Sequence, residues 1–237
     1  MKRVIIVCEG QTEQSFCNDV LMPHFGRLDI FLETPTIKKT HGGIVNWFAL
    51  KSQIERHLSE DKTAIITTLI DYYGLYIRHK FPRWDEAQKT ENRNQRMDII
   101  ENGMLNDVRE NIRSRFIPYI QLHEFECLLF SDISVFDKNF EEREFLDYDY
   151  LTTTIRDHPN PEMINDGNET AASKRLSKII RGNFSKVLYG SLLAQEIGLT
   201  KIREKCTRFN NWILQIEGIA SCNAIVHRDY SGLMQTD

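Results

Sequence analysis

The sequence predicts an α/β fold in which a mostly parallel central sheet is flanked by helices. Val4–Cys8 is a continuous apolar run, which is typical of a strand buried on both faces of a parallel sheet. Gly10 marks a turn into a helix that is expected to run to about Leu21, with Pro23 just beyond its end. Ala64–Ile70 is the next predicted buried strand and is also followed by a carboxylate, so both predicted strands present an acidic residue at the same end.

The remaining elements are expected to complete one Rossmann-like sheet. A helix at 45–59 places Trp47, Leu50, Ile54 and Leu58 at spacings of three and four residues. We expect a single domain over residues 1–217, because 237 residues with 41% hydrophobic content suffice for one substantial core. The other expected elements are a short strand at 30–36, a polar helical insertion outside the core sheet at 85–115, a strand at 116–122, the start of a helix at 123–130, and a C-terminal tail at 218–237.

The charge of the chain is distributed unevenly. A net charge of −4 argues against a protein that coats nucleic acid with its whole surface. Residues 121–169 contain thirteen acidic and three basic side chains, whereas residues 172–208 contain nine basic and two acidic ones. Such neighbouring regions suit a metal site beside a phosphate-binding surface, although ordinary solvated faces explain the pattern equally well.

Several classes of protein are disfavoured by what the sequence does not contain. The five cysteines are scattered and form no C-x-x-C pair, so buried thiols are expected rather than disulfides or a zinc cluster. No P-loop, dinucleotide-binding, zinc-protease or serine-hydrolase motif is present. No apolar run reaches the roughly 18 residues of a membrane span, and no signal peptide is visible, so a cytoplasmic location is expected.

Carboxylates follow three of the predicted strands. Glu9 follows Val4–Cys8, Asp71 follows Ala64–Ile70, and the pair Glu124 and Glu126 follows the strand at 116–122. Ligands bind at the carboxyl ends of strands in such sheets, and clustered carboxylates favour a cation. We therefore predict a Mg²⁺ or Mn²⁺ site suited to phosphoryl transfer. In a helix Glu124 and Glu126 point about 200° apart, so we expect only one ligand there, Glu126 before Glu124.

Further candidates lie near these strand ends and in a later loop. Glu13 is either a metal ligand or a carboxylate stabilised by the helix dipole, and His123 is more simply a structural histidine. Asp166 is a candidate ligand in a turn-rich loop. Lys174 and Arg175 begin a helix and are candidate phosphate-binding residues, with Lys174 stabilising the leaving group, unless both belong to a solvated helix face.

Taken together, these motifs resemble a bacterial family known as domain of unknown function 4276. The resemblance extends from about residue 2 to residue 217. The segments that carry it are Val7-Cys8-Glu9-Gly10-Gln11-Thr12-Glu13, His41-Gly42-Gly43, Asp71-Tyr72-Tyr73-Gly74, Gln121-Leu122-His123-Glu124-Phe125-Glu126, Ile164-Asn165-Asp166-Gly167 and Ser173-Lys174-Arg175-Leu176.

The resemblance implies a Toprim-like core, similar to the nuclease domain of the overcoming-lysogenization-defect family. It implies a nuclease acting on nucleic acid, with DNA as the expected substrate, together with an ABC-type ATPase partner and a role in anti-phage defence. A homodimer of this chain is a further expectation. Toprim-like enzymes carry a second Asp where this sequence has Tyr73. The alternative is therefore a non-catalytic binding or regulatory subunit of an ATPase-containing complex.

Overall fold

A parallel sheet forms the centre of the molecule. The computed structural model describes residues 2–38, 46–165, 167–182 and 186–221. All strand pairs are parallel, in the order β2-β1-β3-β4, and β5 also pairs with β3. This confirms the predicted mostly parallel α/β fold. The strands are β1 (Lys2–Cys8), β2 (Ile30–Glu33), β3 (Ile65–Asp71), β4 (Phe116–Ile117) and β5 (Ile120–Gln121).

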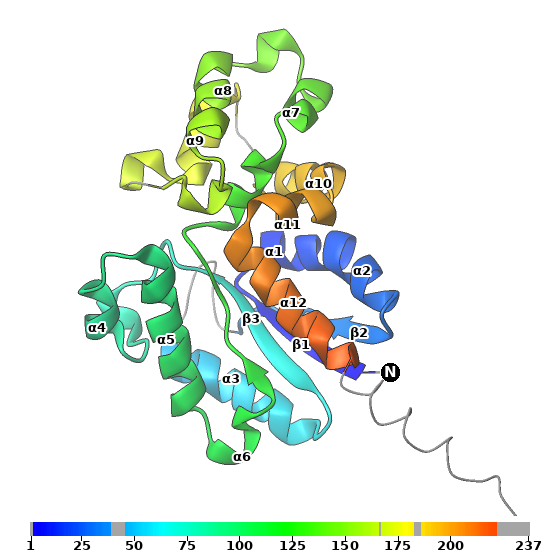
Figure 1. The fold of residues 1–237 in the computed structure, drawn as a ribbon, viewed down its shortest axis with the longest axis vertical. Helices are drawn as coiled ribbons and strands as arrows, with labels where there is room; N and C mark the ends of the chain where they lie inside the picture. Colours follow the sequence, from blue (N-terminus) through cyan, green and yellow to red (C-terminus); the bar gives the residue numbers. More distant parts are fainter. Residues whose placement is uncertain (1, 39–45, 166, 183–185, 222–237) are drawn as a thin grey trace, which may run out of the picture.

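Helices cover both faces of the sheet (Figure 1). One hydrophobic core joins Val4 and Ile6 of β1 to α1, α2 and α12, and a second joins Ile5 and Val7 to α3 and α5. Alternate residues of β1 are therefore buried on opposite faces, as its continuous apolar run predicts. The helices are α1 (Gln11–Phe16), α2 (Met22–Gly26), α3 (Trp47–Glu60), α4 (Trp84–Gln88), α5 (Arg93–Asp107), α6 (Glu110–Arg113), α7 (Ser134–Asn139), α8 (Tyr148–Asp157), α9 (Ala172–Ile179), α10 (Lys186–Ile197), α11 (Leu199–Lys205) and α12 (Thr207–Ser221).

The first helical segment continues past the expected stop at Pro23. A π-helical turn, Cys17–Leu21, links α1 to α2, and the N–H of Met22 donates to the carbonyl of Cys17. Pro23 lies in the first turn of α2, where a residue without an N–H donor is tolerated. The prediction that Pro23 lies beyond the end of the helix is thus wrong, because the widened turn restarts the helix before it.

The expected strand at 116–122 is interrupted in the middle. Pro118 separates β4 from β5 and cannot donate to the ladder. Thr68 of β3 fills the gap, since its hydroxyl donates to the carbonyl of Tyr119 and accepts the N–H of Tyr119. The helix expected to start at His123 is instead a 3₁₀ segment, η3 (Phe125–Ser131), so the chain at Glu124 is still extended.

Helices α4 to α6 correspond to the segment that we expected to be an insertion outside the sheet. They form the crossover between β3 and β4, and α5 buries Met97, Ile100 and Met104 in the same core as α3. A parallel pair requires such a crossover, and an α-helix is its usual form. The segment therefore belongs to the α/β core.

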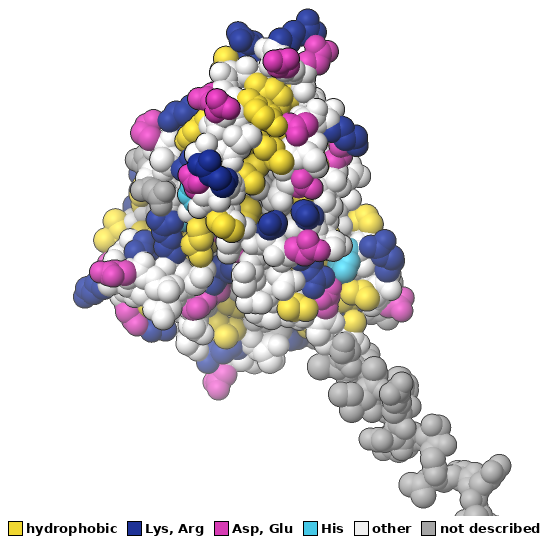
Figure 2. Space-filling model, turned by 45° about the horizontal axis from the view of Figure 1, so that its top comes forward, with side chains coloured by type: hydrophobic (Ala, Val, Ile, Leu, Met, Phe, Trp, Pro, Cys, Tyr) yellow, Lys and Arg dark blue, Asp and Glu magenta, His cyan; other side chains and the backbone are white. Residues whose placement is uncertain are grey.

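A helical lobe of α7, α8 and α9 lies beyond the carboxyl ends of the strands (Figure 1). Figure 2 views the molecule with the top of Figure 1 turned toward the reader, and this face carries hydrophobic side chains among acidic and basic ones. Leu146 and Tyr148 are 51% and 37% exposed. Tyr148 also helps to line a surface pocket of about 380 Å³ with Phe140 and Phe145.

Other expectations concern the cysteines, membrane spans and the tail. Cys8, Cys17, Cys127 and Cys206 are free and buried, as predicted, and Cys222 lies outside the described residues. None of the described helices is long and apolar enough to span a bilayer. The first four residues of the expected tail belong to α12, and residues 222–237 lie outside the described ranges.

Candidate functional site

Glu9 connects the carboxyl ends of the two central strands. Its backbone N–H donates to the carbonyl of Leu69 at 3.0 Å, which extends the β1–β3 ladder by one residue. Its Oε2 accepts the N–H of Asp71 at 2.9 Å. The side chain thus crosses from the end of β1 to the end of β3, where ligands bind in parallel α/β sheets.

Glu13 lies above the same strand end, in the first turn of α1. Its Oε2 accepts the backbone N–H of Gly10 at 2.8 Å, and only 8% of the residue is exposed. The carboxylate therefore satisfies an N–H at the start of the helix, where negative charge is also favoured by the helix dipole. Glu13 therefore stabilises the start of α1 and also lies close enough to Asp71 to act on its charge.

Asp71 is the half-buried centre of the carboxylates. Its Oδ1 accepts the N–H of Phe125 at 3.0 Å, which fixes η3 to the end of β3. Burial raises the pKa of Asp71 well above its ordinary value, and the charges of Glu9, Glu13, Glu126 and Glu124 raise it further. Each of these four carboxylates therefore lies close enough to Asp71 to disfavour its ionised form, and a cation among them would relieve this repulsion.

Glu124 and Glu126 are both buried near Asp71, with 3% and 2% exposed. The expectation that only one of them joins the cluster is wrong, because it assumed a helix at Glu124, where the backbone is extended. Glu124 accepts hydrogen bonds from the backbone N–H and the hydroxyl of Ser173, at 3.0 and 2.8 Å. Sequence reasoning did not find Ser173 as the contact that joins this carboxylate to α9.

His123 has an unusual backbone conformation beside the carboxylates. Its φ of 69° lies in the left-handed region, which costs a residue with a Cβ about 1–2 kcal/mol. Its carbonyl accepts the N–H of Tyr73 at 2.7 Å, and its ring nitrogen lies 3.5 Å from the guanidinium of Arg93. The turn at His123 directs Glu124 back toward Asp71, so its role is compatible with the predicted structural one.

The predicted phosphate-binding residues have different surroundings. Lys174 is exposed in the first turn of α9, next in sequence to Ser173. Arg175 is 6% exposed, and its guanidinium donates to the carbonyls of Thr170 and Ile164 and to the hydroxyls of Tyr150 and Thr154. These contacts give Arg175 a structural role between α8 and α9. Asp166 lies outside the described residues.

The carboxylate oxygens near Asp71 are suitable ligands for a divalent cation, although several of them accept hydrogen bonds from backbone N–H groups. Mg²⁺ and Mn²⁺ prefer oxygen ligands, and the carboxylates around Asp71 supply them. Among the described residues, no three His, Cys, Asp or Glu side chains are arranged to hold a metal ion. Glu9, Glu13 and Asp71 accept backbone N–H groups instead, so metal binding requires their side chains to turn.

The structure thus defines an α/β protein with a carboxylate cluster at the carboxyl edge of its parallel sheet. The chain belongs to the family described as domain of unknown function (DUF4276), whose model matches residues 8–217. A solved structure, the C-terminal region of the Burkholderia pseudomallei OLD protein, is similar with 13% identity and a TM-score of 0.46. The similarity covers 92% of this chain and 98% of that one. No curated protein matches the chain.

We expect Asp71→Asn to stabilise the metal-free protein at pH 8 by on the order of 1 kcal/mol. Asn keeps an acceptor for the N–H of Phe125 and removes a charge among four carboxylates. Because the pKa of Asp71 is raised in the folded state, its contribution is fully favourable below about pH 4 and is lost as the pH rises through the raised pKa. Urea unfolding with chelator at pH 4 and pH 8 should show the gain only at the higher pH.

Asp61→Asn provides a control with the opposite sign. The backbone N–H and hydroxyl of Thr63 lower the pKa of Asp61 to about 2. Its ionised form therefore stabilises the fold above the ordinary pKa, and that stability is lost as the pH falls toward 2. Asp61→Asn should lower stability at pH 8. A loss of stability in both variants at pH 8 would contradict the assignment of Asp71 to a repulsive cluster.

Proposed function

We propose that this protein is a Toprim-like nuclease that depends on Mg²⁺ or Mn²⁺ and hydrolyses phosphodiester bonds in DNA. The observation that carries the proposal is the gathering of carboxylates at the carboxyl edge of the sheet, where Glu9 accepts the N–H of Asp71. Burial, and then the charges of Glu9, Glu13, Glu126 and Glu124, raise the pKa of Asp71 there. Two of them, Glu124 and Glu126, are almost completely buried. Buried like charges cost stability unless a cation accompanies them, so their retention together favours a metal site.

In the proposed mechanism Glu9, Asp71 and Glu126 would hold the metal ion, and Glu13 would lie beside them. The chemistry that such an ion would supply is activation of a water molecule and stabilisation of charge on the leaving oxygen. Ser173 holds Glu124 through two donors, which fixes that carboxylate. Asp71 accepts the N–H of Phe125 in the metal-free structure and would have to turn to bind the ion. Lys174, exposed at the start of α9, is the proposed cation for the leaving group.

Metal binding and DNA cleavage test the proposal together. Calorimetric titration should show Mn²⁺ binding that tightens as the pH rises, because the proton on Asp71 must leave first. Plasmid DNA incubated with the protein and Mn²⁺ should be nicked, and chelator should prevent this. If millimolar Mn²⁺ fails to bind at pH 8, the proposal is wrong.

A second candidate function is a binding or regulatory subunit without catalysis. Two observations favour it. Tyr73 stands where Toprim-like enzymes carry a second Asp. Among the residues that the structure describes, no three His, Cys, Asp or Glu side chains are arranged to hold a metal ion. In both cases we propose an ATPase partner acting in anti-phage defence, as the resemblance of the sequence motifs implies. Mn²⁺ binding without cleavage, even with such an ATPase added, would favour the regulatory subunit.

A further inference from the structure

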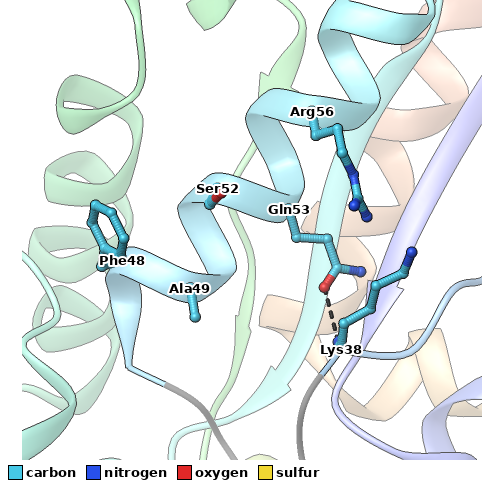
Figure 3. A pocket seen from close by; sticks show the side chains of 6 residues that line it. All are labelled: Lys38, Phe48, Ala49, Ser52, Gln53 and Arg56. Carbon is cyan, nitrogen blue, oxygen red and sulfur yellow. Dashed lines mark hydrogen bonds between the residues drawn. The ribbon is translucent and has the colours of Figure 1, made fainter.

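A surface pocket of about 260 Å³ lies between α3 and the segment that follows β2. Figure 3 shows the side chains of Lys38 and Arg56 extending toward the same opening, with the amide of Gln53 between them. Lys38 is exposed, and the side chain of Arg56 is 48% exposed. The described residues that line the pocket are Lys38, Phe48, Ala49, Ser52, Gln53 and Arg56.

Hydrogen bonds place Lys38 beside the carboxyl end of β1. Thr36 forms a parallel bridge with Cys8, and the N–H of Ile37 donates to the carbonyl of Cys8 at 3.0 Å. The buried amide of Gln53 then accepts the N–H of Lys38 at 2.9 Å and donates to the carbonyl of Thr36 at 3.1 Å. Because Glu9 follows Cys8, the backbone of Lys38 lies near the strand end that carries Glu9, on the side of β2.

The charges around the pocket favour an anion. Arg56 has Glu60 as an ion-pair partner, but at 3.9 Å and with Glu60 67% exposed the pair is weak. Glu33, the carboxylate that ends β2, pairs with Arg3. Lys38 and Arg56 therefore give the opening a positive potential, and the exposed Ser52 adds a hydroxyl donor.

Phe48 adds a second kind of contact to the same pocket. It lies in the first turn of α3 and is 79% exposed, which is unusual for a large aromatic side chain. Figure 3 shows its ring at the start of α3, apart from Lys38 and Arg56, so the aromatic and the cationic groups occupy different ends of the pocket. Surfaces that carry both kinds of group are typical of proteins that bind single-stranded nucleic acid, where unpaired bases stack on the ring. A paired base does not expose its face in this way, so the combination favours a single strand over a duplex.

We propose that this pocket binds a single strand of DNA, with a phosphate on Lys38 and Arg56 and a base stacked on Phe48. The inference rests on the proposed function for the choice of DNA as the ligand. The strand passes from the pocket to the carboxylate cluster at the ends of β1 and β3. Positive groups beside the cluster thereby attract a substrate that the carboxylates alone would repel.

Fluorescence anisotropy of the full chain with a labelled oligothymidylate, in chelator, tests the proposal without any cleavage. Lys38→Ala with Arg56→Ala should weaken binding at least tenfold. It should also reduce the slope of log affinity against log salt by about 0.7, because Lys38 and Arg56 share one phosphate and each phosphate neutralised on a single strand contributes about 0.7. Phe48→Ala should weaken binding about fivefold or more and leave the salt slope unchanged.

The matched control is Arg156→Ala with Lys205→Ala, which removes two exposed positive charges from α8 and α11. It should retain wild-type affinity and salt slope. An equal loss in the control, or an unchanged salt slope in the pocket variant, would overturn the proposal. So would wild-type protein that binds the duplex more tightly than the single strand. Strand binding through the pocket without metal-dependent cleavage would leave this inference standing and remove the nuclease assignment.

Discussion

Glu9→Gln is expected to reduce metal-dependent DNA cleavage by about 100-fold or more. Gln keeps an oxygen that accepts the N–H of Asp71, so the connection between β1 and β3 is preserved. Gln is neutral, so the substitution removes one of the negative charges that are proposed to bind the divalent ion. The measurement is the rate of plasmid nicking with Mn²⁺, beside calorimetric titration of Mn²⁺ on the same preparation.

Glu33→Gln is the matched control for this change. Glu33 is also a carboxylate at the end of a strand, but it pairs with Arg3 on the surface and is not among the carboxylates that raise the pKa of Asp71. Its replacement should leave cleavage and Mn²⁺ binding at wild-type values. Wild-type cleavage by Glu9→Gln would rule out the assignment of Glu9. Reduced cleavage in both variants, with equal loss of stability, would indicate a folding effect.

Arg208→Met is expected to lower the free energy of unfolding by about 3–5 kcal/mol. The guanidinium of Arg208, with 11% of the side chain exposed, lies 2.6 Å from Glu101 and 2.7 Å from Asp98, both on α5. Met fills a similar volume but leaves Glu101, whose side chain is 14% exposed, without its counter-charge. The substitution removes the ion pairs that join α12 to α5. Urea unfolding at pH 8 measures the loss of stability.

The pH dependence and a second substitution distinguish this effect from simple loss of packing. Burial already raises the pKa of Glu101 to about 7 with Arg208 in place, so without Arg208 the carboxyl group should be protonated at pH 5. The deficit of Arg208→Met should therefore be smaller at pH 5 than at pH 8. Glu101→Gln in the Arg208→Met background should recover part of the stability at pH 8. A deficit independent of pH would indicate lost packing alone.

Local pattern was enough to predict the central strands and their acidic ends. Val4–Cys8 is apolar without alternation, and Ala64–Ile70 is interrupted only by Thr67 and Thr68, because both faces of the sheet are covered by helices. Parallel strands end at the same edge of a sheet, so the convergence of Glu9 and Asp71 was predictable on the condition that the two strands are neighbours, which they are. The helix at 45–59 was predictable for a similar reason, since its apolar residues repeat every three to four positions.

The segment after β5 was not predictable from local pattern. Nothing in the residue types indicates that His123 adopts a left-handed conformation, and a helix there would separate Glu124 from Glu126. The left-handed turn depends on pairing between neighbouring chains, in which the carbonyl of His123 accepts the N–H of Tyr73. Likewise, an arginine can bind phosphate, and nothing in the sequence excludes this for Arg175. Only the packing of α8 against α9 shows that its guanidinium donates to acceptors inside the protein.

The sequence by itself therefore determined the parallel sheet and the position of Glu9 and Asp71 at its carboxyl edge, because periodicity and strand ends are local properties. The sequence also offered Glu13 and Glu126 as candidates for the same cluster. Tertiary structure alone decided that Glu124 lies near Asp71 as well, and that Ser173 holds it. It also decided that Lys38 and Arg56, 18 positions apart, share one pocket. The reason is physical: charge repulsion and hydrogen bonding depend on distance in space, which separation along the chain does not determine.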